Sequence, residues 1–120
     1  MAFPSRVLGA GTSGGTTTAI CGDVSVKTSG GTTIADAVAV SAAINSVSGA
    51  LNSGVIIPPA ETGAMVVVSN TNASNAIKVY PQVGTTIDGI VAATGVSIAG
   101  GKTRIFFGIT PTSWVSALSA

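Results

Sequence analysis

The sequence predicts a mainly β fold, an antiparallel β-sandwich or jelly-roll-like barrel with at most one short helix. Short apolar runs recur along the chain, and each ends at residues that favour turns, such as Pro58-Pro59 and Gly100-Gly101. Roughly seven or eight short strands at such spacing are typical of sandwiches and small barrels. Because two-residue turns join neighbouring strands, we expect mostly antiparallel pairing.

The first part of the chain is the least regular. Residues 1–18 are rich in Gly and Thr, and we expect them to form an extended N-terminal arm. A single β domain would then span residues 19–120. Its first strand is expected within residues 18–27, where Val24 and Val26 alternate with polar residues.

Residues 33–51 are the one candidate helix. Apolar side chains recur there at spacings of three and four, and Thr33 with Asp36 resembles a capping box. The alternation of apolar residues from Val38 to Ile44 indicates a strand instead. We favour the helix, although the sequence leaves both structures open.

The remaining strands are separated more clearly. Pro58 and Pro81 cannot donate to a sheet ladder, so each ends the apolar run before it. The expected strands are Val55–Ile57, Met65–Val68, Ala76–Tyr80, Thr85–Val91, Gly95–Ala99, Lys102–Ile109 and Trp114–Leu118. We expect Thr, Ser and Asn side chains to cover their outer faces.

Charge is scarce in this chain. The 120 residues include five Lys or Arg, four Asp or Glu and no His, with a net charge of +1, whereas about a quarter of an ordinary domain is charged. We therefore expect much of the surface to contact other protein. The absence of a basic cluster argues against nucleic-acid binding. No apolar run is long enough for a membrane helix, and the N-terminus does not resemble a signal peptide, so we expect synthesis in a cytoplasm and no membrane contact.

Motifs for catalysis or for cofactor and metal binding are weak. Residues 9–14 match GxGxxG in letters, but only eight residues precede them and Gly15-Thr16 is a poor helix start. The four carboxylates are scattered, no His could activate a Ser, and Cys21 is alone, which excludes an internal disulfide. We predict that the protein is not an enzyme and has no catalytic, cofactor-binding or metal-binding residues. Tyr80, Phe106, Phe107 and Trp114 are expected in the core and in subunit contacts.

The order of features over roughly the last two thirds of the chain resembles small virion proteins of tailed bacteriophages, the capsid decoration or cement proteins. An apolar strand ends at Pro58-Pro59-Ala60, a Gly and a Val-rich strand lead to Asn70, and the next strand ends at Tyr80-Pro81. An Asp-Gly turn, a late apolar strand and a Trp follow, here Asp88-Gly89, Ile105-Phe106-Phe107 and Trp114. The Ala-rich stretch from Ile34 to Leu51 departs from that pattern.

The resemblance implies a structural protein on the outside of a virion capsid, made in the host cytoplasm. Its partners would be the major capsid protein and further copies of itself, as a homotrimer or another small oligomer. Our candidate contact residues are Phe3, Pro4, Arg6, Val7 and Trp114, although we also expect the Trp114 side chain to be buried.

Two alternatives remain at this point. The first is a phage tail or fibre module that binds a receptor or a carbohydrate, for which an exposed Trp114 would be the best support. The second is an ice-binding or adhesive β-solenoid, suggested by the Thr, Ala and Gly content. A solenoid requires a regular repeat, and no fixed Thr-x-Thr period is present.

Overall fold

The computed structural model describes residues 8–11, 13–16 and 22–120, and this part of the chain is mainly β, as predicted. Its one element of helical type with defined bounds is the short 3-10 turn η1 (Ile34–Asp36). The strands are β1 (Val24–Thr28), β2 (Val38–Ala39), β3 (Ile44–Ser48), β4 (Gly54–Ile56), β5 (Met65–Asn70), β6 (Ile77–Tyr80), β7 (Thr86–Ile87), β8 (Ile90–Val91), β9 (Val96–Ile98), β10 (Thr103–Thr110) and β11 (Ser113–Leu118).

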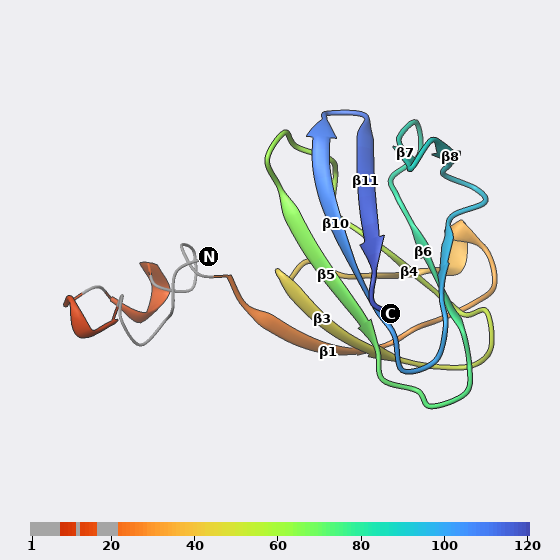
Figure 1. The fold of residues 1–120 in the computed structure, drawn as a ribbon, viewed down its shortest axis with the longest axis horizontal. Coiled ribbons are helices and arrows are strands. Elements are labelled where there is room, and N and C mark those ends of the chain that lie inside the picture. Colours follow the sequence, from red (N-terminus) through yellow and green to blue (C-terminus); the bar gives the residue numbers. More distant parts are fainter. Residues whose placement is uncertain (1–7, 12, 17–21) are drawn as a thin grey trace.

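The first six strands wind as a coil between two sheets (Figure 1). The odd-numbered strands β1, β3 and β5 lie side by side in the larger sheet, and the even-numbered strands β2, β4 and β6 lie side by side in the smaller one. Every neighbouring pair within these two sets is parallel. Each turn returns the chain to the same sheet after roughly 20 residues, within the range of solenoid repeats.

The last strands close the coil on one side. β9 pairs antiparallel with β6, β10 with β5, and β11 with β10. The short strand β7 then pairs parallel with β11 and antiparallel with β8. The result is a seven-stranded sheet in the order β1-β3-β5-β10-β11-β7-β8 and a four-stranded sheet in the order β2-β4-β6-β9.

The predicted antiparallel sandwich or jelly roll is therefore corrected to a solenoid-like coil with mixed sheets. Five of the nine strand pairings are parallel. The turn residues do interrupt the strands where expected, but most early turns carry the chain to the other sheet. Consecutive strands then do not pair with each other.

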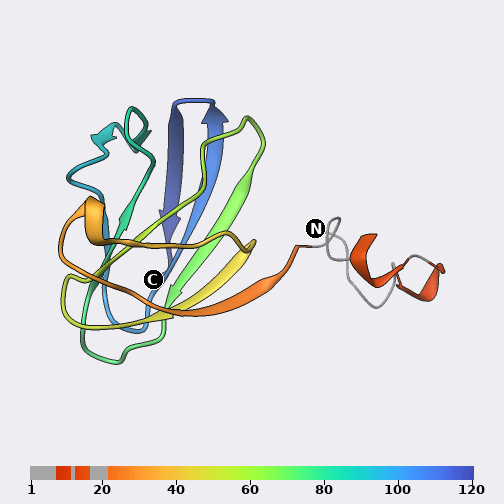
Figure 2. The ribbon, with the colours of Figure 1, turned by 180° about the vertical axis from the view of Figure 1, so that it is seen from behind.

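The predicted helix over residues 33–51 is wrong. Within that range only η1 is helical, and no side chain caps it, because the Thr33 hydroxyl donates to the Asp36 carboxylate (3.2 Å) instead of to a backbone group. At Ala37 the backbone is already extended, and the chain crosses the back of the molecule toward β3 (Figure 2). In β3 the side chains alternate between exposed and buried, with Asn45 and Val47 inside, so the two-residue period decided the structure here.

The core lies between the two sheets. Its buried apolar side chains come from both, and the largest are Trp114, Phe106, Ile57, Ile77, Ile87 and Ile98. Val66 and Val68 of β5 and Phe106 of β10 face this core, so the residues between them face outward.

Two fully enclosed asparagines hold the turns of the coil. The Asn45 amide nitrogen donates to the carbonyls of Ala42 (2.8 Å) and Val67 (3.1 Å), and its oxygen accepts from the Ser25 hydroxyl (2.8 Å). Asn70 donates to the carbonyls of Asn75 and Ile98 at the next turn. These side chains satisfy backbone groups that the parallel ladders leave unpaired where the chain changes sheets.

The described parts of the N-terminal segment lie to one side of the β body (Figure 1). Residues 8–9 and 14–16 are helical there, and the described residues of this segment are exposed. These short stretches are not extended, and residues 1–7, 12 and 17–18 of the expected arm lie outside the described part of the chain. The β body itself begins at residue 22 of the described chain.

Candidate functional site: an apolar sheet face

The outer face of the seven-stranded sheet carries an apolar row that crosses five strands. The register places Val24 of β1 beside Ile44, Ile44 beside Val67, Val67 beside Ile105, and Ile105 beside Ala117 of β11. All five are outward positions, because their sequence neighbours in β3, β5 and β10 point into the core. One cross-strand row of this kind presents a continuous aliphatic ridge.

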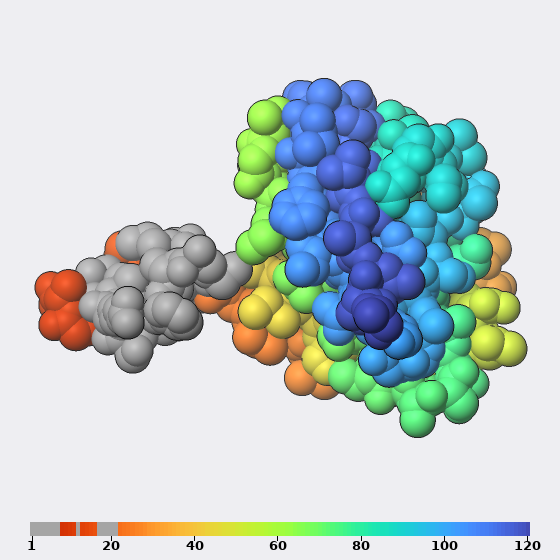
Figure 3. Space-filling model, in the orientation of Figure 1, coloured from red at the N-terminus to blue at the C-terminus, as the bar shows by residue number. Residues whose placement is uncertain are grey.

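A second, shorter row lies beside the first. Met65 of β5 faces Phe107 of β10, and Phe107 faces Val115 of β11. Phe107 is 38% exposed, Met65 and Val115 are similarly exposed, and Ile109 extends the row along β10. We call the two rows together with Ile109 the apolar face. Figure 3 shows β10 and β11 (blue) at the centre of the front surface, with β5 (green) beside them.

No charged side chain belongs to the apolar face. Apart from the Ser and Thr that continue the strands, its outward positions are Val, Ile, Met, Phe and Ala. A contiguous exposed apolar surface bordered by polar residues is a common feature of protein contact sites. The arrangement can bind another surface, but it offers no group for acid, base or nucleophilic chemistry.

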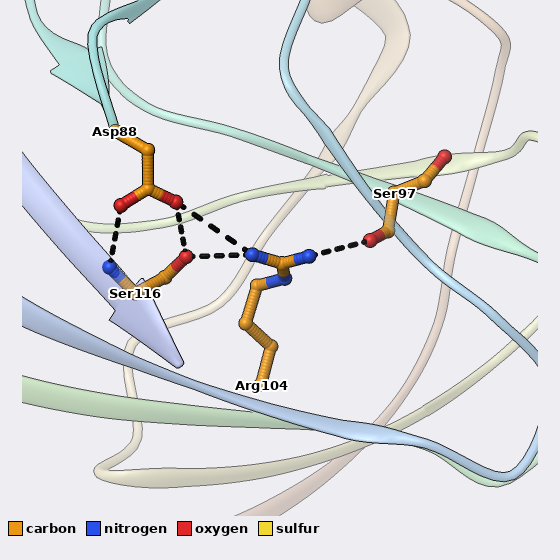
Figure 4. A network of polar contacts seen from close by, with 4 residues as sticks. All are labelled: Asp88, Ser97, Arg104 and Ser116. Carbon is orange, nitrogen blue, oxygen red and sulfur yellow. Dashed lines mark hydrogen bonds and ion pairs between the residues drawn. The ribbon is translucent and has the colours of Figure 1, made fainter. Parts of the chain in front are cut away.

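The most developed polar cluster serves the fold. The Arg104 guanidinium donates to the Ser116 hydroxyl (2.7 Å) and to the Ser97 carbonyl (3.4 Å), and its Nη1 lies 3.6 Å from the Asp88 carboxylate (Figure 4). Asp88 also accepts from the backbone N–H and the hydroxyl of Ser116. Because Ser97 lies in β9 and Ser116 in β11, the cluster connects the two sheets. Within the described ranges, no three potential metal ligands come together.

Of the candidate contact residues from the sequence, Trp114 alone lies within the described part of the chain. Phe3, Pro4, Arg6 and Val7 lie outside the described residues. Trp114 is 1% exposed in the core, as its expected burial requires. Its indole is therefore not available to a partner in this conformation.

The sequence reasoning missed the apolar face. Ser, Thr and Asn were expected to cover the outer faces, whereas the structure places aliphatic side chains and Phe107 there. Of the four aromatic residues assigned to core and contact roles, Tyr80, Phe106 and Trp114 are buried and Phe107 is outside. Because Phe106 and Phe107 are adjacent on one strand, only one of them can face the core, and this alternation was the signal that could have revealed the face.

Comparisons with known proteins add no family assignment: no family model and no curated protein matches the chain. Among the residues that the structure describes, none form a helix with the length and apolar character needed to span a membrane.

Proposed function

We propose that this protein is a structural virion protein that docks through its apolar face onto the outside of a tailed-phage capsid and stabilises the shell. The observation that carries the proposal is the uncharged row from Val24 to Ala117, together with Phe107 and its neighbours. The choice of a capsid as partner rests on the resemblance of residues 57–114 to decoration proteins. The scarcity of charge in the whole chain supports extensive contact with other protein.

Docking would act as a clamp. A specific interface needs roughly 800 Å² from each partner, and within it a few central side chains contribute most of the binding energy. Phe107 is suited to such a role because it is the large aromatic side chain of the apolar face and stands between Met65 and Val115. A protein that binds only the assembled shell stabilises that shell by mass action.

Oligomerisation would strengthen the attachment. In a homotrimer, as the resemblance implies, or in another small oligomer, several weak contacts act together, and the second contact forms at a high effective concentration. Partners in this proposal are the major capsid protein and further copies of the chain, and the site of action is the capsid surface.

The alternative functions have less support. Trp114, the best candidate for carbohydrate binding by a tail or fibre module, is buried, and the exposed aromatic Phe107 lies within the apolar face. The solenoid-like coil is compatible with the ice-binding alternative. However, the outward positions of β1, β3 and β5 carry Val24, Ile44 and Val67 in one row and Val26, Ser46 and Ser69 in the next, instead of an array of Thr.

A binding assay with purified shells tests the proposal. Expanded phage capsids that lack the protein are mixed with the recombinant chain and sedimented, and the bound copies are counted by quantitative mass spectrometry against the major capsid protein. We expect a ratio of order one or one-third. Failure of the protein to bind shells, or only a few copies per particle, would contradict a decoration role.

A pair of variants locates the contact. Phe107→Glu places a charge in the centre of the apolar face and should reduce binding at least tenfold. Val83→Glu is the matched control, because Val83 is 83% exposed in the turn after β6 and is not one of the residues of the apolar face. Equal loss of binding in both variants, or no loss in Phe107→Glu, would show that the apolar face is not the contact surface.

A further inference from the structure

The first turn of the coil leaves one sheet edge open. β1 is the terminal strand of the seven-stranded sheet, and among the described residues its only neighbour there is β3. Ile44 N–H donates to the Asp23 carbonyl (3.0 Å) and Ser29 N–H donates to the Ser48 carbonyl (3.1 Å). Because backbone groups alternate in direction along a strand, the odd-numbered residues of β1 bond to β3, and the N–H and C=O groups of Val24, Val26 and Thr28 point to the open edge.

This edge is also apolar and exposed. Val24 is 67% exposed and Val26 is 81% exposed, the latter among the most exposed large apolar side chains of the described chain. An exposed strand edge with such side chains is a template for pairing with another strand. Natural proteins often protect such edges with a Lys, and Lys27 occupies that role here.

Two charges at the ends of the edge have no ionic partner within the described part of their own chain. Lys27 makes no ion pair there, and Asp23 accepts a hydrogen bond from the Ala43 N–H (3.1 Å) but contacts no cation. The two residues bracket the short stretch Asp23-Val24-Ser25-Val26-Lys27. If this stretch is reversed end to end, Lys27 takes the position of Asp23 and Val26 takes the position of Val24, while Ser25 stays at the centre.

We propose that β1 is a homodimer edge: two copies pair antiparallel along β1, with the Ser25 residues facing each other on a two-fold axis. In this register Val24 of one copy is opposite Val26 of the other, and each such pair exchanges both of its N–H···O bonds, because these are the groups directed to the open edge. Asp23 is opposite Lys27 of the second copy, and this happens twice by symmetry. Opposite charges on facing residues favour the pairing, and the Lys that would protect a lone edge is neutralised.

The charges of Asp23 and Lys27 favour a second copy of the chain as the partner of the β1 edge. A two-fold interface requires a surface that is complementary to itself, and the palindromic order of charge, valine, serine, valine and charge satisfies this requirement at a single register. A shift by two residues would remove the direct pairing of Asp23 with Lys27. The chain's net charge of +1 adds little repulsion between copies.

Such a dimer joins the larger sheets of the two copies and sets their apolar faces side by side through Val24 and Val26. The proposal does not depend on the capsid function, since the edge and its charges belong to the free protein. It also differs from the trimer implied by the resemblance, and the mass of the particle separates the two.

Sedimentation velocity of the full chain over a range of concentrations tests the assembly. We expect a species of twice the 11.5 kDa chain mass, with a dissociation constant between about 1 μM and about 1 mM, because a short edge buries little area. A monomer at all concentrations up to about 1 mM, or a trimer, would overturn the proposal.

Charge exchange tests the register. Lys27→Asp and Asp23→Lys should each weaken self-association at least tenfold, since each sets like charges opposite one another. An equimolar mixture of the two variants restores both opposite-charge pairs and should form a heterodimer with wild-type affinity. Circular dichroism and thermal melting verify that each variant is folded. A mixture that stays monomeric while both variants are folded would contradict the assigned register.

Two further variants test the contact at the backbone and at the axis. Val26→Pro removes an N–H that β3 does not use, so it should abolish pairing, while the control Val26→Thr retains the N–H and should pair normally. In a Cys21→Ser background, Ser25→Cys should form an intermolecular disulfide under mild oxidation, because facing residues of a non-hydrogen-bonded pair lie about 4.5 Å apart at Cα, within disulfide range. Ser48→Cys on the neighbouring strand is the negative control. Dimerisation that persists in Val26→Pro would place the interface elsewhere.

Discussion

Replacing Asn45 by Ala is expected to destabilise the fold by about 3 kcal/mol. The side chain is fully buried and makes two donor bonds, to Ala42 and Val67, and one acceptor bond, from Ser25. A typical intramolecular hydrogen bond contributes about 1 kcal/mol net, and a buried partner left unsatisfied adds to the loss. For a domain of this size the melting temperature should fall by about 12 °C, at about 4 °C per kcal/mol.

Urea unfolding followed by circular dichroism measures the effect of this change. Ser25→Ala is the matched control, because it removes only the bond that Asn45 accepts, and we expect it to cost about 1 kcal/mol. If Asn45→Ala costs no more than Ser25→Ala, the asparagine does not hold the turns of the coil, and our account of the parallel architecture is refuted.

Four further substitutions have distinct expected outcomes. Phe106→Ala should lower the free energy of unfolding by about 3–5 kcal/mol because it leaves a cavity in the core. Phe107→Ser on the outer face should lower it by under about 1 kcal/mol. Similar losses for both variants in urea unfolding would show that we have assigned the wrong residues of β10 to the core. Gly108→Ala should destabilise by more than about 2 kcal/mol, since its Cβ would lie 2.0 Å from a backbone carbonyl oxygen, and a normal melting temperature would refute that crowding. Asp88→Asn should change the free energy of unfolding by less than about 1 kcal/mol. The side chains of Asp88 and Arg104 are 35% and 17% exposed, and Asn tolerates the positive φ at this position. A larger loss in thermal melting would show that the ion pair is essential to the fold.

Several strands that follow residue 53 were predictable because local chemistry defines them, whereas the single strand expected over residues 85–91 is instead a hairpin of β7 and β8 with its turn at Asp88 and Gly89. Pro58 follows the strand that ends at Ile56, and Pro81 follows the strand that ends at Tyr80, since a proline at either place cannot continue the ladder. The expected strand over residues 102–109 is found at 103–110, and the one over 114–118 is found at 113–118. Turn and strand residues act over a few positions, so one sequence is enough to place them.

Pairing could not be read from the same signals. The partner of β1 is β3, and the segment of chain that connects these two strands passes through η1 and contributes β2 to the other sheet. Local propensity does not indicate that the chain returns to the first sheet after crossing to the second. The choice between the helical and the strand period of residues 33–51 depends on the burial of Asn45 and Val47 in the folded coil. Tertiary context overrides weak helical periodicity in this way.

The candidate site was hidden for a related reason. Alternation along β5 and β10 fixes which residues share a face, but the sequence does not say which face is covered. The run from Met65 to Val68 is apolar on both faces, as in a strand that is buried on both faces. Only the sheet order shows that one face is left without a covering layer.

The coil has a consequence for the order in which the chain folds. The parallel pairs of the coil join strands that are close in the sequence. In contrast, β5 gains its second neighbour only when β10 pairs with it and Val66 lies opposite Phe106. Closing this longer loop costs little additional entropy, because each doubling of loop length adds only about 0.6 kcal/mol. The delay matters more than the cost: on a growing chain, β5 stays an open, strongly β-prone edge until residues 103–110 have been synthesised, and a product truncated before them would expose that edge to aggregation.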